Sequence, residues 1–448
     1  MSHRLIDSYF SAENYSAEDD EIIAGDLSAE EAEAALAVEE AANAVEMADL
    51  TVEELQHAAG SLESIQTYIE GVMEQSERGL SAESAQAVAL AHESAVGTAL
   101  PNPVASLESF GADSTRMEAT EHSLEGIGET LKKVGKSIID AIKKAMKAIA
   151  DFFKNLFSGV KKSRKQLDDL TKALEKKKSD GAATEEKEVE VVSAKALANS
   201  KGEIDLNDGC KQIQDFYKSH VDTMLSDVET YMETMGGVIA GMSETVKDLQ
   251  KQVENGETPS EDDLKKMKDK FSDDLKNMKT TYSKKSDLPK VADLPGQVAV
   301  SGISVTDPVN DEEVIVAFSL DGADDAKDPN EKISMPSLDD AIEASKCADA
   351  LLATIEDGEK RRKTANEARE KVIESMEGLM KAAGSDSSDE GQKASKFLKD
   401  ASSFLNKAMK MASKNFLSGV QKVDNNTYKF ARASMKTLKK VESAYAAS

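Results

Sequence analysis

Several kinds of residue are scarce in this 448-residue chain, and their scarcity limits the kinds of fold and function to expect. The chain has no tryptophan, and aromatic residues make up only 4% of it. Large aromatic side chains dominate the cores of many globular domains. Their scarcity, beside abundant alanine, glutamate, lysine and methionine, predicts long helices that pack through small and aliphatic side chains. We therefore expect a mainly α fold, with long amphipathic helices in a bundle or coiled-coil arrangement.

Cysteine and long apolar runs are scarce as well. The two cysteines, Cys210 and Cys347, are far apart and form no CxxC pattern, so we expect reduced thiols in a reducing compartment. The N-terminus lacks the basic-then-apolar pattern of a secretory signal peptide. No window approaches the roughly 18 consecutive apolar residues that a membrane-spanning helix needs. These absences predict a soluble protein made in the cytoplasm.

Lysine is missing from the first part of the chain, where the charge is strongly acidic. The first lysine is Lys132, and residues 1–108 hold 23 acidic and two basic residues, a net charge of −21 out of −28. The remainder carries −7, although residues 131–180 and 391–448 are each +9. The acidic part is either a solvated helical arm or a detachable segment that neutralises or solubilises the basic parts.

Changes in composition, together with prolines and glycines that interrupt helices, divide the chain into six expected segments. Pro101 and Pro103 close the acidic part, because proline ends helices. The alternating stretches QVAVSGISV and EVIVAFSL predict a small strand pair near 296–320. Gly60 is expected to end one helix before Ser61 starts another, and a second lysine-rich helix is expected from Lys161 to Lys178. A kink is expected near Gly236-Gly237, a helix start capped by Ser337, and two lysine-rich helices between 392 and 445. The stretch KNFLSGVQK at 414–422 is similar to KNLFSGVKK at 154–162. The expected segments are an acidic helical propeptide at 1–108, partly disordered, a cleavable linker at 109–125, cationic amphipathic helices at 126–180, a long helical region at 181–287, a β insertion at 288–336, and a C-terminal helical region with a basic end at 337–448.

The sequence contains no recognisable catalytic or metal-binding pattern. None of the five histidines has the spacing of a metal site. No phosphate-binding glycine loop, nucleophile elbow or kinase signature is present. The acidic stretch at 321–331 lacks the ligand spacing of an EF-hand. We therefore expect no metal, no cofactor and no enzymatic activity.

The stretch GIGETLKKVGKSIIDAIKKAMKAIADFFKNLF, residues 126–157, has the pattern of a cationic amphipathic helix. Its apolar residues recur in steps of three and four, as on one helix face: Ile127, Leu131, Val134, Ile138, Ile142, Ala145, Ile149, Phe153, Leu156 and Val160. The lysines fall off this stripe: Lys132, Lys133, Lys136, Lys143, Lys144, Lys147 and Lys154. The helix could pack in a bundle core, lie on an anionic membrane, or place its lysines on the phosphates of DNA.

A short Ser-x-Glu motif occurs twice near the change of charge. Ser106-Leu107-Glu108 precedes Ser109, and Ser123-Leu124-Glu125 precedes Gly126. Serine and glutamate are common here, and this spacing is also usual at helix starts. The position of the two copies, after the prolines and in an expected exposed linker, favours proteolytic processing.

The stretch from Ser106 to Val134 resembles the internal head proteins (prohead core or inner body proteins) of large tailed bacteriophages of the giant-myovirus type. The resemblance implies an acidic N-terminal propeptide that acts in prohead assembly. It also implies that a prohead maturation protease cuts after Glu108, with Ser106 and Leu107 as recognition positions, and secondarily after Glu125. The implied place is the virion interior, and the implied partners are this protease, capsid or other internal head proteins, and packaged DNA or an anionic membrane, with an oligomer possible.

Two other functions stay open at this point. A membrane-active helical protein, such as a pore-forming toxin, could act through residues 126–160. An enzyme ranks last, because no constellation of residues supports one. The remainder after Glu108 departs from a DNA-condensing protein, because its net charge is still −7.

Overall fold

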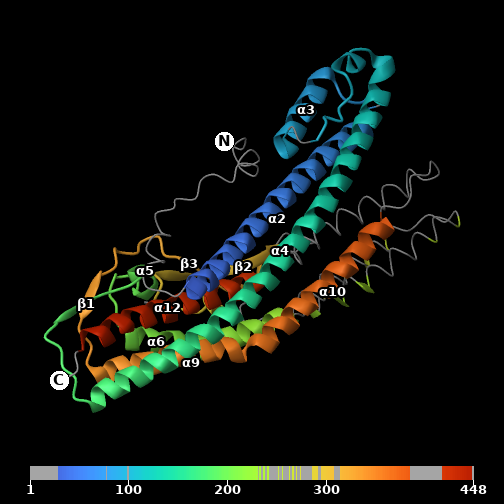
Figure 1. Ribbon diagram of the computed structural model, residues 1–448. Coiled ribbons are helices and arrows are strands. Elements are labelled where there is room, and N and C mark those ends of the chain that lie inside the picture. The colour runs from blue at the N-terminus through green and yellow to red at the C-terminus, as the bar shows by residue number, and fades with distance from the viewer. Residues whose placement is uncertain are drawn as a thin grey trace.

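The computed structural model is mainly helical, which confirms the expected fold class (Figure 1). It describes residues 29–230, 285–383 and 416–445, apart from gaps at 77, 98–99, 291–293 and 307–312, and scattered helical residues between 232 and 273. The expected disorder before residue 27 lies outside the described residues, as does the first of two helices expected after residue 391.

Three helices form a long arm. Helix α2 (Ala29–Gln75) rises along the arm, α3 (Ala82–Val96) folds over at its tip, and α4 (Asp113–Ser179) returns beside α2 into the body of the molecule (Figure 1). At 67 residues, α4 is about 100 Å long. Asn155 Nδ2 donates to the Ala37 carbonyl of α2 at 3.1 Å, and near the tip the amide of Leu80, between α2 and α3, donates to Thr120 Oγ1 of α4 at 2.9 Å.

Three expected helix boundaries are wrong. Helix α2 continues through Gly60, α4 is not divided before Lys161, and the linker expected at 109–125 is helical from Asp113 onward. No proline occurs between Pro103 and Pro259 to end these helices. A glycine inside a helix costs only about 1 kcal/mol relative to alanine, and burial of the adjacent apolar stripe outweighs this cost.

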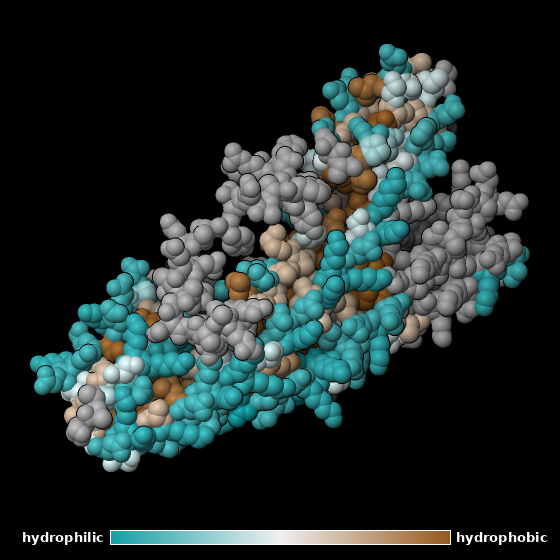
Figure 2. Space-filling model, viewed as in Figure 1, coloured by the Kyte–Doolittle hydropathy of each residue, from teal (hydrophilic) through white to brown (hydrophobic). Residues whose placement is uncertain are grey.

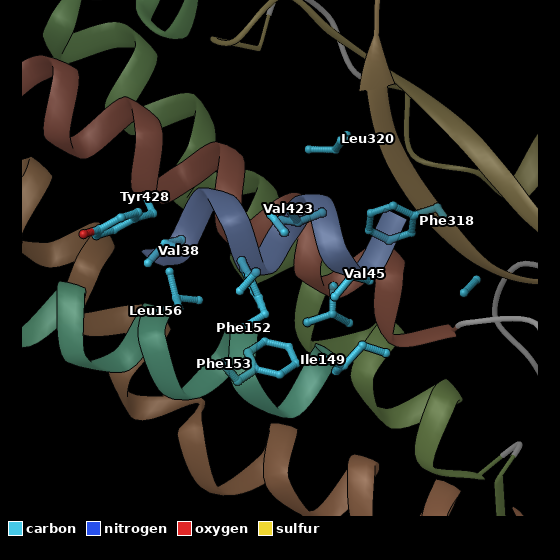
Figure 3. Packing of buried hydrophobic residues seen from close by; sticks show 14 of the residues in the cluster. Val38, Val45, Ile149, Phe152, Phe153, Leu156, Phe318, Leu320, Val423 and Tyr428 are labelled. Atoms are coloured by element: carbon cyan, nitrogen blue, oxygen red, sulfur yellow. The ribbon is translucent and has the colours of Figure 1, made fainter. Parts of the chain in front are cut away.

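The body packs the second half of α4 against α9 (Leu338–Asp357), α10 (Glu359–Ala383) and α12 (Phe416–Ala444). The predicted capping residue Ser337 accepts a hydrogen bond from the Asp340 amide at 3.1 Å and starts α9. Arg164 on α4 joins Asp349 at 2.9 Å and Glu356 at 2.6 Å, both on α9. Phe152, Phe153 and Leu156 of α4 lie beside valines of α2 and α12 in one core (Figure 3).

Residues 181–287, expected to be helical, begin with a different structure. Strand β1 (Glu188–Glu190) and the short α5 (Ala194–Leu197) precede α6 (Leu206–Phe216), so the expectation is wrong for the first part of this segment. Helix α6 continues into a π-helical turn (Tyr217–Val221). Gly236 and Gly237, where a kink was expected, are both helical, but their neighbours lie outside the described residues. A 3₁₀ turn, η3 (Lys285–Asp287), ends the segment.

The predicted strand pair is confirmed. Strands β2 (Val298–Thr306) and β3 (Glu313–Gly322) pair antiparallel, with a register shift between Ile303 and Ser304. The segment is not a self-contained insertion, because β4 (Lys332–Ser334) pairs with the distant β1. Helix α12 approaches β3 closely at Gly419, where a Cβ atom would lie 2.3 Å from the Phe318 carbonyl oxygen.

A buried ion pair joins three parts of the body. Arg362 on α10 is 2% exposed and Asp424 on α12 is fully buried; Arg362 Nη2 donates to Asp424 Oδ1 at 2.7 Å. The hydroxyl of Tyr217, in the π-helical turn, donates to the same carboxylate. Burial and the charge of Asp424 raise the pKa of Tyr217 well above its ordinary value. The phenol is therefore neutral and remains a donor to Asp424.

The two cysteines are joined, which contradicts the expectation of reduced thiols. A disulfide links Cys210 on α6 to Cys347 on α9, across a sequence separation of 137 residues. The sequence alone did not indicate this pairing, because the two cysteines are far apart in the chain and α6 and α9 become neighbours only in the folded body. The bond ties the helix after the β1 region to the helix after the β insertion.

Candidate functional site

The first Ser-x-Glu motif lies on the surface, in the connection between α3 and α4. Ser106, Leu107 and Glu108 are all exposed, and Leu107 keeps 45% of its surface in water. The motif enters a single 3₁₀ turn, η1 (Leu107–Phe110), which the Ser109 amide closes by donating to the Ser106 carbonyl at 2.9 Å. A turn held by so few hydrogen bonds opens at little cost, as proteolysis requires.

The chain is anchored immediately after this motif. Phe110 is buried to 2% exposure, and Thr115 Oγ1 donates to the Ser109 carbonyl at 2.8 Å. The half-buried Ser109 therefore marks the border between an exposed segment and the start of α4. A cut between Glu108 and Ser109 would leave the fold on its C-terminal side attached through Phe110.

The second motif is held inside α4. Ser123 is fully buried, donates to the Ala119 carbonyl at 2.8 Å and accepts from the Ala105 amide at 3.0 Å. At Gly126 a Cβ atom would lie 2.5 Å from the Pro103 side chain. Leu124 is half-buried, and Glu125 is exposed but helical. The linker prediction is wrong here, and Glu125 can reach a protease only after this part of α4 unfolds.

The apolar stripe of α4 is covered by the rest of the protein. All ten of its predicted residues, from Ile127 to Val160, are buried. Helix α2 lies along most of the stripe, and α9 and α12 cover its end in the body. Figure 2 shows hydrophobic residues gathered along the arm between α2 and α4, while the outer side of α4 is hydrophilic. The bundle-core interpretation therefore describes this helix in the intact chain.

The lysines beside the stripe remain on the surface. Lys133, Lys136, Lys143, Lys144, Lys147 and Lys154 are exposed, while the side chain of Lys132 lies outside the described residues. The acidic segment therefore does not cover the six described lysines. The acidic helix α2 covers the apolar stripe instead, because a helix packs through its apolar face and leaves its charges in water.

Three of these lysines border a groove that the sequence analysis missed. The groove has a volume of about 470 Å³ and lies between α2 and α4. Its α2 side is made of Ala37, Glu40, Ala41 and Ala44, and its α4 side includes Lys144, Lys147 and Lys154. The spacing of alanines in ALAVEEAANA was the available signal, because it gives one helix face small side chains.

A larger groove of about 1000 Å³ lies between β1, α4 and the end of α12. Its charges pair across it, as in the 3.2 Å contact between Lys440 and Glu190. None of the predicted site residues lines this groove. Among the residues that the structure describes, no cluster of histidine, cysteine or acidic side chains could hold a metal. Within the same residues, no helix is both long and apolar enough to cross a bilayer.

Comparison with protein families gives a match along nearly the whole chain. The model of a family described as phiKZ-like phage internal head proteins matches residues 20–441, which is nearly the whole chain. No curated protein and no solved structure matches.

Proposed function

The chain belongs to the phiKZ-like phage internal head proteins, and we propose that it is made as a precursor with a removable acidic segment. Family membership places the protein inside the phage head, in association with other capsid components, and suggests a non-enzymatic role. In the proposal, residues 1–108 act in prohead assembly. The prohead maturation protease then cuts after Glu108.

The exposure of Ser106-Leu107-Glu108 is the observation that supports this site. A protease binds its substrate as an extended strand, so the cost of cleavage includes unfolding the local structure. At Glu108 this cost is a 3₁₀ turn on the surface. At Glu125 it includes exposing the buried Ser123 and opening α4 against Pro103. Glu108 is therefore the primary site in this proposal, and Glu125 is not cut in the folded precursor.

The acidic segment has a packing role before its removal. Helix α2 buries the stripe of α4, which would otherwise be an amphipathic cationic helix of the kind that binds anionic membranes. In the described residues the stripe of α4 is therefore not free to enter a bilayer, and the membrane-active alternative loses its main support. Covering the stripe would keep the precursor soluble while the prohead assembles.

Removal of the segment would also change the charge that packaged DNA meets. Loss of residues 1–108 takes the net charge from −28 to −7. Long-range repulsion from DNA would fall accordingly. The exposed lysines of α4, among them Lys133 and Lys136, would then contact phosphates with less opposition from the acidic arm.

N-terminal sequencing of the protein from purified virions tests the proposal, with Ser109 as the expected first residue. In phage carrying Glu108→Gln, which removes the carboxylate from an exposed side chain, the protein should stay uncut at this position. The matched Glu125→Gln variant should be processed normally. A virion protein that is intact would contradict the proposal, and so would processing to Gly126 in phage that carry Glu108→Gln.

A further inference from the structure

The outer face of α2 carries an apolar ridge. The large hydrophobic residues that are most exposed in the described chain all lie between residues 36 and 107: Leu36, Met47, Leu50, Tyr68, Leu90 and Leu107. Four of them are on α2, with 45–50% of each residue exposed. At 3.6 residues per turn, these four fall within about 60° of one another around the helix. They therefore lie along one side of α2, with the polar Asn43, Glu54 and Ser61 between them, and we define the four as the ridge.

The ridge borders the alanine groove between α2 and α4. On the helical wheel, Glu40 lies beside Leu36 and Met47, and Ala44 and Ala37 follow toward α4. The alanines Ala37, Ala41, Ala44 and Ala148 give the groove small side chains, which allow another helix to approach closely. Lys144, Lys147 and Lys154 supply positive charge on its α4 side. A fitting occupant is a helix with an apolar edge and acidic flanks.

Helix α2 of a second copy has this chemistry, and we propose that two copies of the intact chain pair through their α2–α4 arms. In a two-fold pair, the ridge of each α2 would lie on the ridge and in the groove of the other copy. The acidic flanks of each α2, part of a segment of net charge −21, would meet the lysines of the other copy's α4. The phosphates of DNA could pair with the lysines of the groove, but DNA would leave the apolar ridge in water.

The size of the surface suits a specific pair. From Leu36 to Tyr68 the ridge extends about 48 Å at 1.5 Å per residue, and a helix is about 10 Å wide. The strip therefore covers on the order of 500 Å² in projection and more in accessible area, close to the roughly 800 Å² per partner of a standard interface.

This pairing is a property of the uncut chain and goes beyond the proposed processing. Sedimentation velocity on the purified full-length chain, without protease, tests it at concentrations up to about 100 μM, a range that reveals weak pairs. The expected mass is twice the 48.2 kDa of one chain. Double substitution Met47→Glu/Leu50→Glu should return the mass to one chain at the same concentration. Both residues are exposed, so circular dichroism and the melting temperature should not change.

Charge variants test the lysine side of the groove. Lys144→Glu/Lys147→Glu should weaken the pair at least tenfold and remove its sensitivity to salt, since screening acts on charged contacts. The same charge change at the exposed Lys360 and Lys363 of α10 is the matched control and should have no effect.

Three results would overturn the pairing. One is a wild-type chain that remains monomeric at 100 μM, and another is a dimer that survives Met47→Glu/Leu50→Glu. The third is a monomer that binds a short DNA duplex through Lys144 and Lys147. All three results are measured on the uncut full-length chain, so they test the pairing independently of whether cleavage occurs after Glu108.

Discussion

A cut after Glu108 should not by itself release the acidic segment. The cut opens only the connection between α3 and α4, whereas α2 stays packed along the stripe of α4. Leu62 and Ile69 of α2 are fully buried, and Val45 is 1% exposed. We therefore expect the two fragments of a folded, cut chain to remain together as a non-covalent complex.

The strength of this complex should respond to single buried side chains of α2. A buried Leu→Ala or Ile→Ala substitution costs about 2–5 kcal/mol, including the cavity that it leaves. Because each 1.4 kcal/mol is tenfold in a dissociation constant, Leu62→Ala should weaken the cut complex by about 30-fold or more. Leu90→Ala on α3 is the control. Leu90 is 59% exposed, so its loss should change the constant by less than about threefold.

The assay begins with the folded full chain. Residues 106–109, which are largely exposed, are replaced by the recognition sequence of a site-specific protease, and the chain is cut after purification. Size-exclusion chromatography over a range of concentrations then measures whether residues 1–108 elute with the remainder. Separation of the wild-type fragments at micromolar concentration, or equal dissociation of the Leu62→Ala and Leu90→Ala complexes, would refute the reasoning.

The remaining predictions concern the body. Asp424→Asn should lower the free energy of unfolding by about 3–5 kcal/mol, since it leaves Arg362 as a buried charge without its partner; in chemical denaturation, a loss below 1 kcal/mol would contradict the buried pair. The pKa of Tyr217 is higher in the folded state than its ordinary value of 10.0 in the unfolded state. Below pH 10.0 this group therefore does not change the free energy of unfolding, and above pH 10.0 it lowers that free energy, because only the unfolded state loses the proton. That alkaline loss should be absent in Tyr217→Phe when melting is compared across pH. Non-reducing peptide mapping should recover Cys210 linked to Cys347, and Cys210→Ser/Cys347→Ser should cost about 2–4 kcal/mol; two free thiols would refute the link.

The helices and the β pair were predictable because their signals are local. The stripe from Ile127 to Val160 follows a helical period, and QVAVSGISV alternates as a strand does. The exposed position of Glu108 was also predictable, because Pro101 and Pro103 disfavour a helix just before it. These features depend on neighbours in the sequence, which a single chain displays directly.

The failures came from contacts between distant residues. Ser123 is buried in contact with the Ala105 amide, which lies 18 residues earlier in the chain, and the pairing of Cys210 with Cys347 depends on α6 meeting α9. The similar stretches KNLFSGVKK and KNFLSGVQK share one structural feature, a glycine in close contact with another part of the chain. Gly159 and Gly419 each permit a close approach, to the Tyr428 hydroxyl and to the Phe318 carbonyl respectively. Nothing in the sequence named these partners.

The packing also predicts the order in which Ser-x-Glu sites become available. Glu108 follows exposed residues, whereas the copy at Ser61-Leu62-Glu63 contains the fully buried Leu62, and the copy before Gly126 contains the fully buried Ser123. The first copy is buried in α2 at the core of the arm, and the second is held where α4 packs on Pro103 and Ala105, so both can be cut only after the arm opens. In a time course of prohead maturation, a terminus at Ser109 should therefore appear before any terminus at Ser64 or Gly126. The earlier appearance of either inner terminus would mean that the arm opens before the connection is cut, and that α2 does not protect α4 in the prohead.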